Sequence, residues 1–223
     1  MAHNRTDIRK RSAQAPLSDQ IYQHLKWSLT IGEYAPGDEL SIRSLAAKMG
    51  TSAMPVREAL TRIASERLLV SSANRSYKVA DLDSKRVADQ FFVRARLEGI
   101  ATALAVPNMT TEEINTLEEL GAQMLQDVQE GDHESYIVRN YNFHFSIYAA
   151  AGNDELFWII ESLWAQTGPF LAQIVRDQEM PEDWQILHAE IAKAIRARNS
   201  EHAARLIEKD ISWSTNSFQA MQD

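Results

Sequence analysis

The chain has 223 residues, 44% of them hydrophobic, so it can bury a sizeable core in one or two domains. It has no cysteine, which excludes disulfide bonds and thiolate chemistry and fits a cytoplasmic protein. The net charge of −8 is unevenly divided: residues 1–80 carry 12 Lys and Arg against 7 Asp and Glu, whereas residues 81–223 carry 11 against 24. A basic front and an acidic rear predict two domains, with any polyanion bound to the first.

The first 16 residues, MAHNRTDIRKRSAQAP, are polar and predict a flexible arm rather than a secretory signal. Their basic run, RKR, either contacts nucleic acid or is simply solvated. No apolar run in the chain approaches the roughly 18 residues that a membrane-spanning helix requires. We therefore expect no membrane partner.

Two short helices are predicted after the arm. Residues 17–32 carry Leu and Ile at helical spacing, with Ser18 as a candidate N-cap and Gly32 as the end signal. The segment APGDEL then predicts a turn. The segment SIRSLAAKMG predicts the second helix, capped by Ser41 and ended by Gly50.

The stretch TSAMPVREALTRIASERLL, residues 51–69, predicts a third helix with Ser52 as its N-cap. Pro55 falls in the first turn of this helix, where its missing N–H costs little. The apolar segments LLV and YKV then predict two strands joined by the polar turn SSANRS. The second and third helices, joined tightly at Gly50 and followed by a two-stranded ribbon, predict a winged helix-turn-helix over residues 17–80.

The N-terminal end of this third helix is the predicted DNA-reading element, because a helix-turn-helix inserts that end into the major groove. Ser52 can donate a hydrogen bond to a phosphate, and Arg57 can contact a guanine edge or a phosphate. The alternative for Arg57 is an exposed intrahelical contact with Glu58 or Thr61, although adjacent helical residues do not face each other.

Two other parts of the same domain are placed to contact DNA. The second predicted helix, which is the first of the helix-turn-helix pair, crosses the phosphate backbone of the DNA. Arg43 lies on this helix. The tip of the wing carries Asn74 and Arg75, which can reach the neighbouring minor groove. Double-stranded DNA is therefore the predicted partner of the basic front domain.

Residues 81–223 show helical periodicity and no strand-like alternation, so they predict an all-α bundle. The predicted helices span about 83–106, 110–130, 133–151, 154–177, 181–198 and 200–220. Thr110 and Glu113 form a predicted capping box at the second of these helices. Aromatic burial is the default expectation for four tryptophans, Trp158, Trp164, Trp184 and Trp213.

Four residues of this bundle could form a metal site. Asn140 and His144 are four residues apart and share one face of a helix. His188 and Asp210 lie 11 residues before and after Asn199, so an antiparallel hairpin turning there places them at the same height. Two imidazoles and a carboxylate suit a divalent ion of the zinc or nickel type. The alternative is a hydrogen-bonded core histidine at position 144 and a solvated carboxylate at position 210.

The front domain resembles the winged-helix domain of GntR-family bacterial transcription regulators. The motifs G-x-Y-x-P-G, LA-x-x-x-G and PVREAL-x-R occur in the order and spacing of that family, and the match covers residues 17–80. The resemblance implies DNA-contacting roles for the following positions: Arg43, Ser52, Met54, Pro55 and Arg57.

This domain also departs from the family pattern. Ala53 stands where the family usually has Arg, which removes one guanine contact worth about 1–3 kcal/mol of discrimination. Arg67 stands where a glycine is usual before the strand, and the wing glycine is replaced near residues 74–76. We therefore expect an operator that differs from the usual one.

The rear domain resembles the FCD effector domain of the FadR-type branch, in its VanR-like six-helix form. The matching segments are R-x-x-LE, FH, A-G-N and H-x-x-I-x-x-AI, at residues 94–98, 143–144, 151–153 and 188–195. The resemblance implies a small-molecule effector in the bundle, with Arg94 placed to bind a carboxylate bidentately. The alternative for Arg94 is a structural pair with Glu98, one helical turn away.

Many relatives bind one divalent metal through an Asp and three His. Two of those positions correspond to His144 and His188, but the Asp position is Asn140 and the last His position is Asp210. The carboxylate has thus moved to another helix, which indicates either a relocated site or one that has been lost.

Together these observations predict a ligand-responsive transcription regulator that binds a near-palindromic operator as a homodimer. It is not expected to be an enzyme, because no glycine-rich phosphate loop, G-x-S-x-G or H-E-x-x-H motif is present. One alternative is a metal-dependent hydrolase localised by a DNA-binding domain, which requires an open metal position and a general base. A third class, a DNA-organising protein without a ligand, would have a rear domain filled by apolar side chains.

Overall fold

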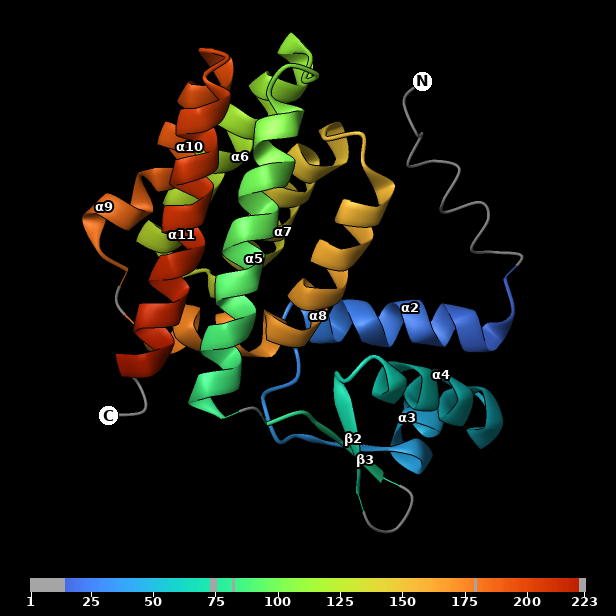
Figure 1. The fold of residues 1–223 in the computed structure, drawn as a ribbon. Helices are drawn as coiled ribbons and strands as arrows, with labels where there is room; N and C mark the ends of the chain where they lie inside the picture. The colour runs from blue at the N-terminus through green and yellow to red at the C-terminus, as the bar shows by residue number, and fades with distance from the viewer. Residues whose placement is uncertain (1–14, 73–75, 82, 179, 221–223) are drawn as a thin grey trace.

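The computed structural model describes residues 15–72, 76–81, 83–178 and 180–220. Within these ranges a winged helix-turn-helix precedes a bundle of helices, which confirms the predicted fold class (Figure 1). The first 14 residues of the predicted arm, and Asn74 and Arg75 of the predicted wing tip, lie outside the described residues.

The winged domain comprises the following elements: α2 (Leu17–Thr30), β1 (Glu39–Ser41), α3 (Ile42–Lys48), α4 (Ala53–Ser65), β2 (Leu69–Ser72) and β3 (Ser76–Val79). Ser41 caps α3 as predicted, since its hydroxyl accepts a hydrogen bond from the amide of Ser44. The N-cap of α2 is Pro16 rather than the predicted Ser18, because the carbonyl of Pro16 already accepts from the amides of Asp19 and Gln20. The helix therefore starts two residues earlier than the predicted cap implied.

The sheet of the winged domain has three strands in the order β1-β3-β2, whereas the sequence predicted two strands and a turn. Strand β1 pairs antiparallel with β3, with Leu40 opposite Tyr77, and Leu40 is buried in the core of this domain. A strand of three residues carries little periodicity, and β1 is stabilised by pairing with a strand far along the chain. Its prediction from local pattern alone therefore failed.

The helical bundle comprises α5 (Ser84–Ala105), α6 (Thr111–Glu130), α7 (His133–Ala150), α8 (Asp154–Asp177), α9 (Glu182–Gln185), α10 (Leu187–Arg196) and α11 (Ser200–Ala220). The capping box of Thr110 and Glu113 is present at the start of α6. The helix predicted over 181–198 is wrong in one respect: it is divided into α9 and α10 at Ile186.

The expectation for the tryptophans holds for Trp164 and Trp184, which are buried, and Trp213 packs against the same core. It is wrong for Trp158, whose side chain is 63% exposed on α8. Burial is a default for aromatic side chains, and an exposed one marks surface available for contact with another molecule. In the described part of the chain, no helix is long and apolar enough to cross a membrane.

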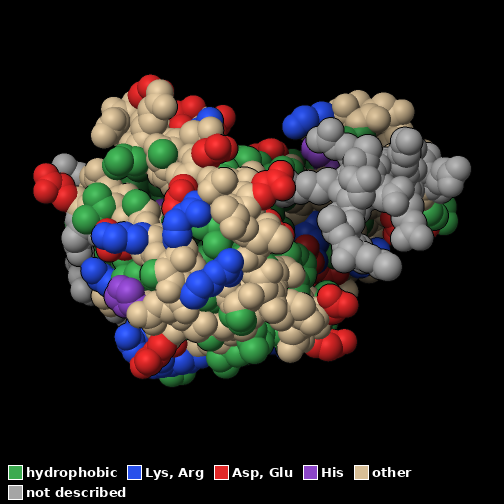
Figure 2. Space-filling view, turned by 90° about the horizontal axis from the view of Figure 1, so that it is seen from above, with side chains coloured by type: hydrophobic (Ala, Val, Ile, Leu, Met, Phe, Trp, Pro, Cys, Tyr) green, Lys and Arg blue, Asp and Glu red, His purple; other side chains and the backbone are tan. Residues whose placement is uncertain are grey.

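Helix α2 lies between the rest of the winged domain and the lower end of the bundle, where it contacts α8 (Figure 1). The end of the bundle seen in Figure 2 shows basic and acidic side chains mixed together. Exposed ion pairs occur both between helices, as in Arg196 of α10 with Glu118 of α6, and within one helix, as in Arg205 with Glu201 of α11. The single-sign surface expected of a polyanion-binding face is absent from this view of the described residues.

Candidate functional site

The N-terminal tip of α4 projects small and polar side chains into solvent. Ser52 is the N-cap residue, but its side chain makes no capping hydrogen bond, so the hydroxyl remains available. Met54 is 70% exposed, and Pro55 in the first turn is only partly covered. A helix terminus that exposes its amides and a small surface allows a phosphate backbone to approach closely.

Two arginines stand beside this tip. Arg43 in the first turn of α3 and Arg57 in α4 are exposed, and neither guanidinium pairs with another described residue. The predicted alternative for Arg57 involved Thr61, but the Thr61 hydroxyl donates to the backbone carbonyl of Arg57, 2.8 Å away. The geometry therefore leaves both cations available for an anionic partner.

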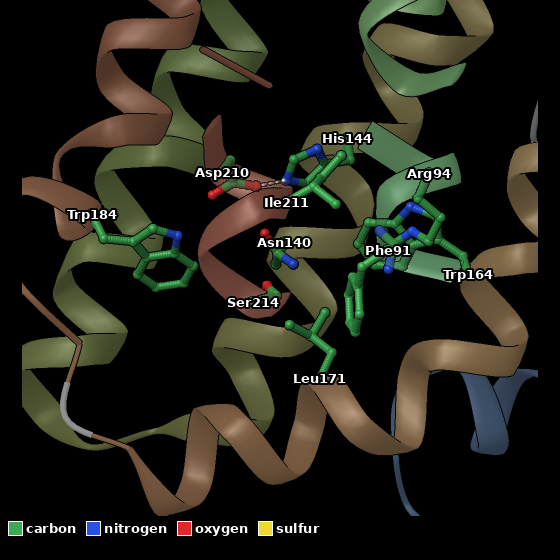
Figure 3. A pocket seen from close by; sticks show the side chains of 10 residues that line it. All are labelled: Phe91, Arg94, Asn140, His144, Trp164, Leu171, Trp184, Asp210, Ile211 and Ser214. Atoms are coloured by element: carbon green, nitrogen blue, oxygen red, sulfur yellow. Dashed lines mark ion pairs between the residues drawn. The ribbon is translucent and has the colours of Figure 1, made fainter. Parts of the chain in front are cut away.

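A second polar site lies inside the bundle (Figure 3). Its walls are built by side chains from several helices, with Arg94 on α5 and Trp184 on α9 on opposite sides. Its cavity is about 10 Å³, which is room for about one water molecule or one ion. A predominantly apolar filling, which would have favoured a ligand-free DNA-organising protein, is not what the described residues show.

Three of the four predicted metal-site residues, Asn140, His144 and Asp210, line this pocket, and His188 lies beside them. Nε2 of His144 lies 3.3 Å from Oδ2 of Asp210, and Nε2 of His188 lies 3.9 Å from Oδ1 of the same carboxylate. The two Nε2 atoms are 3.4 Å apart, and Oδ1 of Asn140 lies 3.0 Å from Nε2 of His188. The hairpin of α10 and α11 thus places His188 and Asp210 at one height, as their spacing around Asn199 required.

Hydrogen bonds on the far side of His144 determine which of its nitrogens carries hydrogen. Tyr148 donates its hydroxyl hydrogen to Glu98, and its oxygen lies 2.9 Å from Nδ1 of His144. Because the tyrosine oxygen is then the acceptor, Nδ1 of His144 is the donor, and neutral His144 has a lone pair on Nε2. That lone pair faces Asp210, so two acceptors oppose each other unless a proton or a metal ion lies between them.

Burial controls the charges in the pocket. Burial lowers the pKa of His188 to about 4, so this imidazole is neutral near pH 7. Burial alone would raise the pKa of Asp210, but His188, His144 and Arg94 outweigh it and hold the pKa below its usual value. Oδ1 of Asp210 is buried and has no hydrogen-bond partner among the described residues, which leaves an anionic oxygen free to bind a cation.

Arg94 does line the pocket, but its guanidinium is already engaged. Its Nε donates to Glu98 at 2.7 Å and its Nη1 donates to Thr167 at 2.8 Å. The guanidinium also lies 4.1 Å from the ring centroid of Trp164, and the side chain is almost fully buried. The structural pair with Glu98 is therefore present. An effector could be contacted only by the N–H donors of the guanidinium that Glu98 and Thr167 do not accept.

Comparison with known proteins identifies both domains. The GntR family model, described as bacterial regulatory proteins, matches residues 17–79, and the FCD domain model matches residues 89–212. The chain belongs to the GntR family and carries an FCD domain. This GntR protein is thus a transcription regulator rather than an enzyme, and the hydrolase alternative gains no support.

Known relatives agree with this assignment. The chain is 32% identical to the HTH-type transcriptional regulator McbR of Escherichia coli over 188 residues, 83% of this chain and 85% of that protein. It is 26% identical to the E. coli HTH-type transcriptional repressor GlaR, over 85% of this chain and 90% of that protein. The solved structure of E. coli McbR/YncC is similar with a TM-score of 0.87 at 27% identity, covering 94% of this chain and all of that one.

Two hydrogen-bond partners of pocket residues in this FCD domain escaped the sequence analysis. Tyr148 follows Asn140 and His144 at the same four-residue interval, so its position on the same face of α7 was visible in the sequence. Thr167 carried no such signal, because its contact with Arg94 joins positions 73 residues apart. Local spacing therefore identifies residues that share a helix face, but not partners on a facing helix.

Proposed function

We propose that this GntR-family regulator binds a near-palindromic DNA operator as a homodimer and releases or engages it in response to a small carboxylate effector. The tip of α4 supports the DNA contact, because Ser52, Met54, Pro55 and Arg57 are available at one helix end. Asn74 and Arg75 belong to the same proposed interface by their place in the wing. As a regulator of transcription, the protein acts where the bacterial DNA lies, in the cytoplasm.

The dimer interface is proposed to lie on the outer face of α5 and the neighbouring start of α8. Val93, Ile100 and Leu104 of α5 are 44%, 53% and 43% exposed, and their spacing of seven and four residues places them on one face of the helix. Trp158 on α8 is 63% exposed. Large apolar side chains left exposed on a bundle are typical of an isologous contact with a second copy.

One divalent ion of the zinc or nickel type is proposed to bind His144, His188 and Asp210, with Asn140 as an additional oxygen ligand. The observation that carries this proposal is the convergence of the three side chains, whose candidate ligand atoms all lie within 4.8 Å of one another. The lone pair of His144 and the unpartnered Oδ1 of Asp210 fit such an ion. The carboxylate moved from α7 to α11 thus supports a relocated site.

Such an ion, when bound, supplies the positive charge that attracts a carboxylate effector. Glu98 already neutralises Arg94, so the guanidinium alone offers an anion little net charge. The indole N–H groups of Trp164 and Trp184 are buried without a hydrogen-bond partner among the described residues, and both side chains line the pocket. They are proposed to donate to the effector. Because the cavity holds only about 10 Å³, an organic acid must displace part of its wall.

The test is elemental analysis of untagged protein purified without chelator, repeated on His188→Ala. We expect about one metal ion per chain in the wild type and loss of the ion in the variant, because removal of one ligand from such a site is not compensated. The matched control is His202→Ala, which removes an exposed imidazole of α11 and should keep the metal. A metal-free wild type would contradict the metal proposal and leave Arg94 with an organic pocket.

A further inference from the structure

Helix α8 presents two neighbouring faces with different partners. One face belongs to the pocket: Trp164 and Leu171 line it, and Thr167 accepts the hydrogen bond from Arg94. The other face is offset by one residue and contacts the winged domain through Ala165, Gly168, Ala172 and Arg176. Ala165 is even part of the hydrophobic core of the winged domain. The pocket wall and the domain contact are thus the same helix.

At Gly168 the backbone of α8 lies very close to the winged domain. A Cβ atom at this position would lie 2.2 Å from the backbone oxygen of Thr30 and 2.9 Å from that of Leu29, at the end of α2. Real Cβ atoms essentially never approach other atoms closer than 3.0 Å, so only glycine fits. Backbone lies directly against backbone here, with no flexible side chain between the helices to absorb a displacement.

Two further contacts reinforce this joint. One turn further along α8, Ala172 lies against Gly32, where a Cβ would come within 2.1 Å of the alanine methyl group. Gly32 adopts a φ of +68°, which favours glycine in any case. Nη2 of Arg176 then donates to the carbonyl of Gly32 at 3.0 Å. The end of α2 is therefore held at three successive positions of α8.

A path of aromatic rings joins the pocket to α2 at a second place. Trp164, which supports the guanidinium of Arg94, meets the ring of Tyr141 edge-on at 5.8 Å. Tyr141 in turn meets Trp27 of α2 edge-on, with ring centroids 4.9 Å apart. These edge-on contacts connect the wall of the pocket to α2 through one intermediate ring.

Helix α2 is itself fixed to α4, the helix that carries the DNA-reading tip. Its buried residues pack with Val56 and Leu60 of α4 in one core. At the end of α4, Glu66 accepts a hydrogen bond from Tyr22 at 2.6 Å and pairs with Lys26 at 3.2 Å. Lys26 also lies 3.7 Å from Glu161 of α8, so one α2 side chain touches elements of both domains.

From this arrangement we infer that the contact of Gly168 with the end of α2 is a rigid joint that sets the orientation of the DNA-reading helix. A displacement of α8 at the pocket is passed through this joint to the winged domain. The inference rests on the proposed function in one respect, since it assigns the route by which occupancy of the pocket changes DNA binding. The joint itself is a property of the protein without any ligand.

The joint is tested on the full-length protein by measuring a distance between the domains. Because the chain has no cysteine, Lys48→Cys on α3 and Glu119→Cys on α6, both exposed, can carry a pair of spin labels. The distance distribution is recorded by pulsed electron paramagnetic resonance, with labelled chains diluted into unlabelled protein. We expect Gly168→Ala to shift and broaden the distribution, because the new methyl group forces the helices apart.

The matched control is Gly121→Ala in α6, where a Cβ would meet its nearest atoms at 3.8 Å, an ordinary contact. This variant should leave the distribution unchanged. If Gly168→Ala does not fold, Arg176→Ala removes the bond to Gly32 at an exposed residue and should give a smaller shift in the same direction. Distributions identical to the wild type in the folded variants would overturn the joint.

Transmission is tested with Zn²⁺ alone as the probe, and the bound metal is measured in the same samples. Where Zn²⁺ is bound, the distance in the otherwise unsubstituted labelled protein should shift, and Gly168→Ala should bind as much Zn²⁺ with the shift lost. Bound Zn²⁺ without a shift would overturn transmission, as would a shift that persists in the variant. If the wild type binds no Zn²⁺, the metal proposal fails. The rigid joint is then tested only by comparing the distance distributions of the ligand-free wild type and variants.

Discussion

The tip of α4 and the pocket of the bundle are the two proposed ligand sites, and they are opposites in burial. At the tip, Arg57 is exposed and unpaired within the described chain, so it keeps its full charge for a large polyanion. In the pocket, His188 and Asp210 are buried, and their charges depend on each other. An exposed cation costs the folded protein little, whereas a buried polar cluster is expensive unless its members are paired or bind an ion.

This contrast predicts that the metal-free pocket makes the stability of the protein depend on pH. The pKa of His188 is about 4 in the folded protein against 6.5 in a free imidazole, so the unfolded chain binds more protons between these values. The free energy of unfolding therefore has its full value above about pH 6.5 and decreases as the pH is lowered toward 4. The loss is on the order of 3 kcal/mol by linkage.

The measurement is urea unfolding of chelator-treated protein at several pH values in this window. His188→Asn removes the titrating group and should flatten the dependence, while His202→Ala, at an exposed position, should keep it. The lowered pKa of Asp210 acts in the same direction but only below its usual value near 3.8. A wild type and a His188→Asn variant with equal slopes would contradict the assignment of His188 as a buried neutral imidazole.

The exposed site is tested by Arg57→Ala, which should weaken binding to an operator selected from random DNA by the full-length protein. The expected loss is about 1–3 kcal/mol, or roughly ten- to a hundredfold in affinity, if the guanidinium contacts a base. Circular dichroism should be unchanged, since the side chain of Arg57 is exposed and makes no hydrogen bond or ion pair within the described chain. Arg205→Ala, which removes an exposed arginine of α11, is the charge-matched control. Affinity equal to that of the control would refute this orientation of α4.

The same contrast explains what the sequence could predict. The proposed DNA-reading tip occupies one continuous stretch whose cap, first-turn proline and helical periodicity are all local, and α4 forms there as expected. His188 and Asp210 were found because a hairpin of two adjacent helices pairs positions equidistant from its turn. The contact of Thr167 with Arg94 and that of Gly168 with Thr30 join elements far apart in the chain, where spacing carries no information.

The smallest predicted effect compares one backbone feature in the two domains. Arg67 after α4 and Arg198 after α10 both adopt the left-handed conformation, with φ of 66° and 57°. Glycine adopts it without strain, and a non-glycine residue there costs roughly 1 kcal/mol. The side chain of Arg67 is exposed and makes no hydrogen bond or ion pair within the described chain, whereas Nη1 of Arg198 donates to the carbonyl of Val106 at 2.5 Å.

Arg67→Gly should therefore raise the free energy of unfolding, by about 1 kcal/mol or less, because relief of strain is partly offset by the greater freedom of glycine in the unfolded chain. Arg198→Gly relieves similar strain but leaves a carbonyl without its partner, so its net effect should be near zero or destabilising. Urea unfolding of both variants at pH 7.5 measures the difference. Equal changes in the free energy of unfolding at the two positions would contradict this prediction. They would show that the hydrogen bond of Arg198 to Val106 does not contribute to stability and that backbone strain alone determines both effects.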